Sequence, residues 1–215
     1  ILTKIEDNDD VYIQDFKESD FIILRNISVN QIAIYNIVIH LDTLFIFFMK
    51  RMSSPVDEEK SHEVNFCKNY KNRCMTQFYG FIKENTKIIG FIYEFMSNGQ
   101  LDSYLSNKQV SNAFLLMTMN RIFQGIEYLH LNSLIHRDIK PSNIFLNHDF
   151  LSFFSDFETL RHPNYDVEDM TINIGSFYYS SPEQEKDLLL SYSSDIYSFG
   201  LVLFYLFSLE TILQI

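Results

Sequence analysis

Apolar residues in the first half of the chain gather in runs that are typical of strands. The runs are rich in Ile, Val, Phe and Tyr, and short polar breaks separate them. Because β-branched and aromatic residues favour strands and polar clusters favour turns, the pattern predicts a sheet built largely from hairpins. A turn and a short helix, at residues 101–105, are expected after the last run. The runs span residues 21–50, 75–83 and 87–96.

One helix is predicted between the first and second of these runs. Ser54 suits the N-cap of that helix, and Pro55 suits its first helical position. The acidic residues 57–59 would then lie in the first turn, where the helix dipole favours negative charge. Residues with apolar side chains follow at helical spacing, at Val64, Cys67 and Tyr70.

Helical patterns dominate the second half of the chain. Residues 113–131 place apolar side chains on one face of a long helix. Ser194 is expected to cap a second helix, which runs from Asp195 to about residue 209. The segment 132–194 reads as loop-rich and holds most of the reactive residue types. Strands with one helix, followed mainly by helices, predict an α+β fold in two lobes.

Charge and composition narrow the possible partners and the compartment. The formal net charge is -11, and neither nucleic acid nor anionic lipid favours an acidic surface, so we expect no nucleic-acid partner. The longest apolar stretch, residues 32–49, is interrupted by polar residues, and residues 1–20 show no signal-peptide core. Two cysteines are too few for a disulfide framework or a zinc cluster. We therefore expect a cytoplasmic protein without membrane insertion.

The residue types that suit phosphoryl transfer gather near the middle of the second half. Residues 136–143 read His-Arg-Asp-Ile-Lys-Pro-Ser-Asn, and Asp156 follows 13 residues after Asn143. Asp138 can accept a hydroxyl proton, and Lys140 can neutralise a migrating phosphoryl group. Asn143 and Asp156 offer hard oxygen ligands to Mg²⁺. Positioning and charge are what this reaction chiefly requires of a protein.

This segment resembles the catalytic loop of eukaryotic protein kinases, and its Lys-Pro pair is similar to that of serine/threonine kinases. Further motifs stand in the family's order, and together they resemble the tyrosine-kinase-like group most. They are "SDFE" at 155–158, "SPE" at 181–183 and "DIYSFG" at 195–200. The resemblance implies a single bilobal domain over residues 1–215. Its N-lobe would cover about residues 20–96 and its C-lobe, expected to be incomplete, about residues 97–215.

The resemblance also implies a nucleotide site with ATP and Mg²⁺ as cofactors and a protein as substrate. "FFMK" at 47–50 stands where the family has V-A-I-K, so Lys50 would hold the nucleotide phosphates. Its partner would be Glu63, with Glu59 as the alternative. Glu94 and Met96 would bind the nucleotide from the hinge between the lobes.

Regulation by phosphorylation is a further implication of the resemblance. Arg137 precedes the catalytic aspartate, so a phosphate on the segment between 156 and 183 would pair with it. Thr171 is the first candidate for that phosphate, with Thr159 and Ser180 behind it. Ser176 stands where serine/threonine kinases carry a threonine that contacts the catalytic residues. His136 and Asp195 are interpreted as structural residues, the first as a core side chain that packs on Phe157 and the second as an acceptor for the catalytic-loop backbone.

Three departures from the family pattern all concern the nucleotide. The window 28–33, Ser-Val-Asn-Gln-Ile-Ala, contains none of the glycines expected above the phosphates. Phe48 and Phe145 stand where the family has smaller residues against the adenine, and Tyr93 narrows the pocket further. Glu158 replaces the glycine that follows Asp-Phe. Three hypotheses therefore stand side by side: an active serine/threonine kinase, a pseudokinase that acts as a binding or scaffolding module, and a truncated, nonfunctional kinase gene product.

Overall fold

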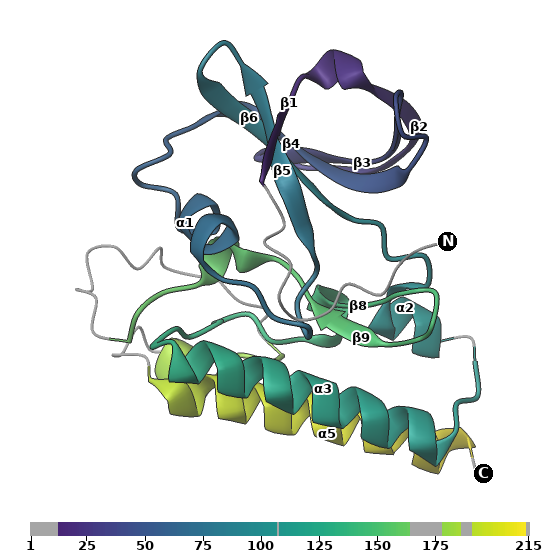
Figure 1. Ribbon diagram of the computed structural model, residues 1–215. Coiled ribbons are helices and arrows are strands. Elements are labelled where there is room, and N and C mark those ends of the chain that lie inside the picture. Colours follow the sequence, from purple (N-terminus) through teal and green to yellow (C-terminus); the bar gives the residue numbers. More distant parts are fainter. Residues whose placement is uncertain (1–12, 107, 164–177, 186–190, 214–215) are drawn as a thin grey trace. The chain divides into compact units, whose positions relative to one another are not determined.

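The computed structural model describes residues 13–106, 108–163, 178–185 and 191–213 (Figure 1). The chain divides into two compact units. The first comprises residues 1–59 and 77–95, and the second comprises residues 60–76 and 96–215. The α+β class is confirmed, because the first unit is built on a sheet and the second is mainly helical. The segment 60–76, expected within the first lobe, groups with the second unit.

The first unit is a six-stranded sheet in the order β1-β5-β6-β4-β3-β2 (Figure 1). Strand β1, which the apolar pattern did not predict, runs parallel to β5, and all other pairs are antiparallel. A short 3₁₀ helix, η1 (Glu18–Asp20), joins β1 to β2. The strands are β1 (Gln14–Phe16), β2 (Phe21–Val29), β3 (Ala33–His40), β4 (Ile46–Val56), β5 (Phe78–Glu84) and β6 (Lys87–Glu94).

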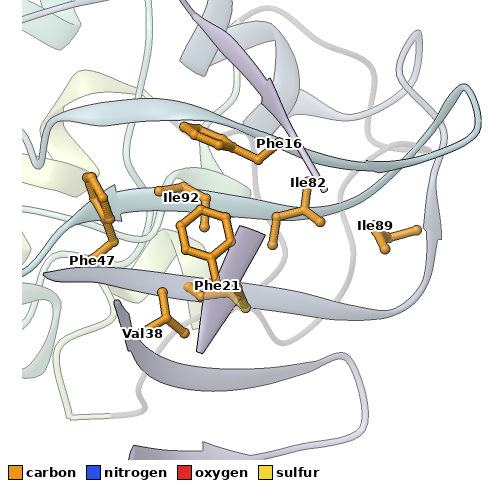
Figure 2. Packing of buried hydrophobic residues seen from close by; sticks show 8 residues of the cluster. Phe16, Phe21, Val38, Phe47, Ile82, Ile89 and Ile92 are labelled. Carbon is orange, nitrogen blue, oxygen red and sulfur yellow. The ribbon is translucent and has the colours of Figure 1, made fainter. Parts of the chain in front are cut away.

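One face of this sheet carries the core of the first unit (Figure 2). Successive residues of a strand point to opposite faces, so Phe47 and Met49 of β4 share the core face, and Phe48 and Lys50 share the other. The side chains at the start of β4 therefore alternate between the core face and the opposite face of the sheet. The core cluster consists of Phe16, Phe21, Val38, Phe47, Met49, Ile82, Ile89 and Ile92.

The predicted start of the first helix is wrong. Ser54 and Pro55 belong to β4, which still pairs with β6 at Val56. Proline is tolerated there because the register between β4 and β6 shifts in this part of the strand, so its missing N–H breaks no regular ladder. The helix α1 (His62–Asn69) begins seven residues later than expected. Its N-cap is Ser61, whose hydroxyl accepts a hydrogen bond from the Val64 N–H at 3.2 Å.

The second unit combines helices with a small three-stranded sheet in the order β7-β8-β9. The helix α2 has the predicted bounds, whereas α5 begins at Tyr192, so Ser194 lies within the helix and does not precede it. Helix α3 runs side by side with α5 (Figure 1). The helices are α2 (Leu101–Leu105), α3 (Asn112–Leu131), α4 (Pro182–Glu185) and α5 (Tyr192–Leu213), and the strands are β7 (Gly99–Gln100), β8 (Ile144–Leu146) and β9 (Ser152–Phe154).

The segment expected to be loop-rich contains β8, β9 and two 3₁₀ turns, η2 (Pro141–Asn143) and η3 (Phe157–Thr159). Both strands are three residues long, too short for their pattern to be distinguished from that of a loop. Among the residues that the structure describes, no helix combines the length and the apolarity that crossing a membrane requires.

Helix α3 packs on β9 through a glycine, and this contact gives a stability prediction. A Cβ at Gly125 would lie 2.6 Å from a ring atom of Phe154. Alanine normally stabilises a helix interior by about 1 kcal/mol relative to glycine. Here we expect the substitution Gly125→Ala to lower the free energy of unfolding by about 1–3 kcal/mol, because the ring must move in a packed interior. Urea unfolding followed by circular dichroism measures the change.

The matched control for this prediction is Gly200→Ala in α5. A Cβ at Gly200 would meet no atom of the described residues within 4 Å, so this variant is expected to be at least as stable as the wild type. A Gly125→Ala protein with unchanged or increased stability would contradict the packing described here.

Candidate active site

The catalytic-loop residues of the second unit converge on one carboxylate oxygen. Lys140 Nζ donates to Asp138 Oδ2 at 2.6 Å, and Asn143 Nδ2 donates to the same oxygen at 2.8 Å. The Asn143 amide also donates to the Asp138 carbonyl at 2.9 Å. The Asp138 side chain is only 8% exposed, so these charge-assisted bonds act in a region of lowered dielectric. They hold the carboxylate in one orientation.

The second oxygen of the same carboxylate is in a different situation. Asp138 Oδ1 is buried and has no hydrogen-bond partner among the described residues. A buried acceptor without a partner is costly, so native structures retain such groups mainly where a ligand or water supplies the missing donor. A hydroxyl group that approached this oxygen would provide that donor and find a base for its proton.

Asp195, at the start of α5, fixes the backbone of the catalytic loop. Its carboxylate accepts the backbone N–H groups of His136 and Arg137, both at 2.9 Å, and lies 2.9 Å from His130 Nε2. Arg137 has a φ of 72°, in the left-handed region that a side chain with a Cβ rarely adopts. The two backbone bonds compensate for that strain. The interpretation of Asp195 as a structural acceptor is confirmed.

Aromatic packing connects the loop to α1 within the second unit. His136 is fully buried, and its ring centroid lies 5.3 Å from that of Phe154 and 6.5 Å from that of Phe157. Phe157 in turn packs against Phe66 of α1, with 4.4 Å between the ring centroids. The interpretation of His136 as a core residue is confirmed. The same helix carries Glu63, which is buried, whereas the alternative Glu59 lies in the exposed turn before it.

The two predicted metal ligands lie at the same end of the β8–β9 pair. Asn143 precedes β8, Asp156 follows β9, and the Ser155 N–H donates to the Asn143 carbonyl at 3.1 Å. Both Asn143 amide hydrogens are already donated to Asp138, which leaves the side-chain oxygen for a cation. Asp156 is exposed, with a φ of 64°. Two protein oxygens completed by phosphate and water fit the coordination that Mg²⁺ prefers.

No cluster of three or more His, Cys, Asp or Glu side chains suited to a metal occurs in the described ranges. A metal held mainly by protein side chains, such as zinc, therefore has no site among them. The Mg²⁺ set of one amide and one carboxylate is of a different kind, because the nucleotide contributes part of the coordination shell.

The segment after Asp156 contains two buried polar residues, Thr159 and Arg161. The Thr159 hydroxyl donates to the His136 carbonyl at 2.7 Å and the residue is 6% exposed, so this hydroxyl is not presented at the surface, and phosphorylation at Thr159 stays a prediction. Arg161, which the sequence reasoning missed, is also buried and donates to the Glu158 and Leu160 carbonyls. Its antiparallel bridge to Ile135, just before the catalytic loop, gave no sequence signal.

Arg137 and Arg161 place two buried guanidinium groups near each other. Burial lowers the pKa of Arg137, and the neighbouring Arg161 cation lowers it further, against the opposing effect of Asp195. Arg137 Nε and Nη1 have no hydrogen-bond partner among the described residues. Since an arginine side chain remains protonated in proteins, these two Arg137 nitrogens are donors suited to an anion.

In the first unit, Lys50 lies on an aromatic face of the sheet. The residue is only 4% exposed, and its Nζ lies 5.7 Å from the centroid of the Phe91 ring. Phe48, two residues earlier on the same face, stacks against Tyr35 at a centroid distance of 5.9 Å and an interplanar angle of 27°. Tyr93, paired with Phe48 across β4 and β6, is buried next to Phe91.

The remaining predicted site residues are distributed over both units. Glu94 ends β6 in the first unit, together with Lys50, whereas Glu63, Met96 and the catalytic loop belong to the second. The half-buried Phe145 lies in β8, opposite Phe153. The pairing of Lys50 with Glu63 and the binding of nucleotide by Glu94 and Met96 stay predictions. Two predicted residues, Thr171 and Ser176, lie outside the described residues.

Comparison with known proteins finds protein kinases among the relatives of this chain. A putative leucine-rich repeat receptor-like protein kinase of Arabidopsis thaliana is 32% identical over 181 residues, which cover 79% of this chain and 20% of the relative. Mitogen-activated protein kinase kinase 1c of Physcomitrium patens is 32% identical over 136 residues, or 62% and 38% of the two chains. A probable LIM domain-containing serine/threonine-protein kinase of Dictyostelium discoideum is 34% identical over 130 residues, or 60% and 20%.

This chain thus spans between a fifth and two-fifths of the length of these relatives. The protein kinase domain family matches residues 33–215, which include the aromatic face with Lys50, the catalytic loop and Asp156. A match over most of the chain, together with the carboxylate geometry at Asp138, leads to one conclusion: the chain belongs to the protein kinase domain family.

Proposed function

We propose that this chain transfers the γ-phosphoryl group of ATP to serine or threonine hydroxyls of a protein substrate. The observation that carries the proposal is the Asp138 carboxylate. Lys140 and Asn143 hold one of its oxygens, and the other is buried with no partner among the described residues. A substrate hydroxyl would donate to the second oxygen. The hydroxyl oxygen would form a bond to the γ-phosphorus while the bond between that phosphorus and the β–γ bridging oxygen breaks. The bridging oxygen leaves with ADP, and Asp138 would accept the hydroxyl proton.

The other residues have supporting roles in this proposal. Lys140, 2.6 Å from Asp138, would neutralise charge on the migrating phosphoryl group. Lys50, with Glu63 as its partner, would hold the nucleotide phosphates, with Glu94 and Met96 as further nucleotide-binding residues. Mg²⁺, held by Asn143 and Asp156, would neutralise charge on the phosphates. The preference for serine and threonine rests on the Lys140-Pro141 sequence and on the name of the Dictyostelium relative.

A second candidate function is that of a pseudokinase, which binds or scaffolds without transferring phosphate. The observation that favours it is the stack of Phe48 on Tyr35, which places two rings on the sheet face that carries Lys50. A packed aromatic pair does not readily accept a further ring beside it. The protein substrate, the cytoplasmic location and the absence of a nucleic-acid partner remain proposals from the sequence in either case.

Removing the base should abolish transfer if the chain is an enzyme. We expect Asp138→Asn to lower phosphate transfer by about 10²–10⁴-fold, because an amide cannot accept the hydroxyl proton. Transfer of radiolabelled phosphate from ATP to a generic protein substrate measures this. The control is Asp149→Asn, which changes an exposed carboxylate in the turn between β8 and β9. Equal activity in the wild type and Asp138→Asn would contradict the role of Asp138, and no transfer by the wild type would favour the pseudokinase.

Trimming the aromatic pair should improve nucleotide binding. Phe48→Ala removes the ring that stacks on Tyr35, so we expect a tighter complex with Mg-ATP and a larger rise in melting temperature at a fixed ATP concentration. Thermal unfolding over an ATP titration gives the comparison. The control is Phe45→Ala, at a position 59% exposed just before β4, which should leave the shift unchanged. Identical ATP affinity in wild type and Phe48→Ala would show that this ring does not obstruct the nucleotide.

Regulation is proposed to act through the two buried arginines. A phosphate on Thr171 would accept hydrogen bonds from Nε and Nη1 of Arg137, which have no partner in the part of the chain that the structure describes. Ser176 would contact the residues proposed for catalysis. We expect Thr171→Ala to reduce phosphate transfer severalfold, because Arg137 would lose the phosphate that it is proposed to bind. Activity before and after phosphatase treatment measures the effect. If phosphatase leaves wild-type activity at its original level, or if Thr171→Ala is fully active, this mode of regulation is wrong.

A further inference from the structure

The turn between β2 and β3 is closed by the side chain of one asparagine. Asn30 Oδ1 accepts the backbone N–H of Ile32 at 2.9 Å and that of Ala33 at 2.7 Å. The N–H of Asn30 itself donates to the Ala33 carbonyl at 3.0 Å. Three of the four backbone N–H groups of residues 30–33 are therefore donated inside the turn.

The position of this turn gives those bonds their significance. Ala33, the first residue of β3, pairs with Met52 of β4, two residues beyond Lys50. The turn and the lysine thus belong to the same part of one sheet. The turn is also the segment that stands in place of a glycine-rich loop, whose backbone comes close to nucleotide phosphates in protein kinases. Successive backbone N–H groups in a turn bind an anion only when they are free to point at it.

We infer that Asn30 prevents the backbone N–H groups of this turn from binding phosphate. The chain therefore discriminates little between ATP and ADP. The inference rests on the proposed nucleotide site and deepens it. A backbone N–H has one hydrogen to donate, and the side-chain oxygen of Asn30 already accepts the N–H groups of Ile32 and Ala33. Recognition of the phosphate chain then depends on Lys50 and the metal. The third phosphate adds little affinity, so ATP and ADP bind about equally well.

Among the three residues at glycine positions of the window, Asn30 differs from Ser28 and Ala33 because its side chain binds the amides of the turn. Ser28, at the first glycine position of the window, pairs with Tyr35 within the β2–β3 ladder. Ala33, at the last glycine position, is fully buried. Neither side chain accepts a hydrogen bond from the amides of the turn among the described residues, whereas Asn30 accepts two.

The test compares the binding of ATP and of ADP by calorimetry, with Mg²⁺ and with a chelator, in the wild type and three variants. Asn30→Ala removes the acceptor, Asn30→Asp keeps an acceptor at the same place, and Asn26→Ala is the control at an exposed position of the same hairpin. The wild type, Asn30→Asp and Asn26→Ala should show ATP and ADP affinities within about threefold of each other. Asn30→Ala should bind ATP about tenfold tighter with a smaller gain for ADP, as expected for one or two recovered hydrogen bonds.

Amide hydrogen exchange provides the second readout. The Ile32 and Ala33 amides should be protected in the wild type and lose that protection in Asn30→Ala, and phosphate binding should restore it. If the wild type binds ATP but Asn30→Ala shows the same ATP-to-ADP ratio, the inference is overturned while the proposed function stands. If no variant binds any nucleotide and none transfers phosphate, both the proposed function and this inference fail.

Discussion

The candidate active site depends on the contact between the Asp195 carboxylate and the backbone of the catalytic loop. Two backbone N–H groups and His130 surround a carboxylate that is only 1% exposed. Such a charge is stable in a protein interior only when hydrogen bonds replace its lost hydration. The same bonds hold Arg137 in its left-handed conformation and so set the direction in which the chain enters Asp138. The carboxylate geometry at Asp138 is a consequence of this arrangement.

The first unit presents the opposite situation, in which apolar packing competes with function. Strand alternation places Phe47 and Met49 in the core and leaves Phe48 beside Lys50. The rings on that second face stabilise the sheet by apolar burial, yet they also occupy the surface where a nucleotide is expected. A similar competition occurs in the β2–β3 turn. Asn30 stabilises the turn by accepting two backbone N–H groups that could otherwise donate to a phosphate. The question of enzyme or pseudokinase is therefore concentrated in this unit.

Residue order predicted much of the fold, and the errors have physical causes. The helix α2 was placed correctly because its apolar positions and flanking turn agree. The start of α1 was misplaced, because Ser54-Pro55 satisfies every local criterion for a helix start although pairing of Val56 with Ile88 extends the strand past it. A short-range capping preference is worth only about 1 kcal/mol, so contacts with residues distant in sequence can override it. Arg161 was missed because its neighbour Arg137 is distant in sequence.

The sequence by itself determined the family and pointed to the residues proposed for catalysis. Phosphoryl transfer requires certain residue types at set spacings, and residues 136–143 with Asp156 display both along the chain. Only the tertiary structure decided which contacts those residues make and how deeply they are buried. It showed which oxygen of Asp138 is held and which has no partner among the described residues, and that Thr159 is buried. It also showed that Asn30 accepts two backbone N–H groups of its turn. Hydrogen-bond partners and burial depend on groups that folding brings together, and the spacing of residues along the chain does not specify them.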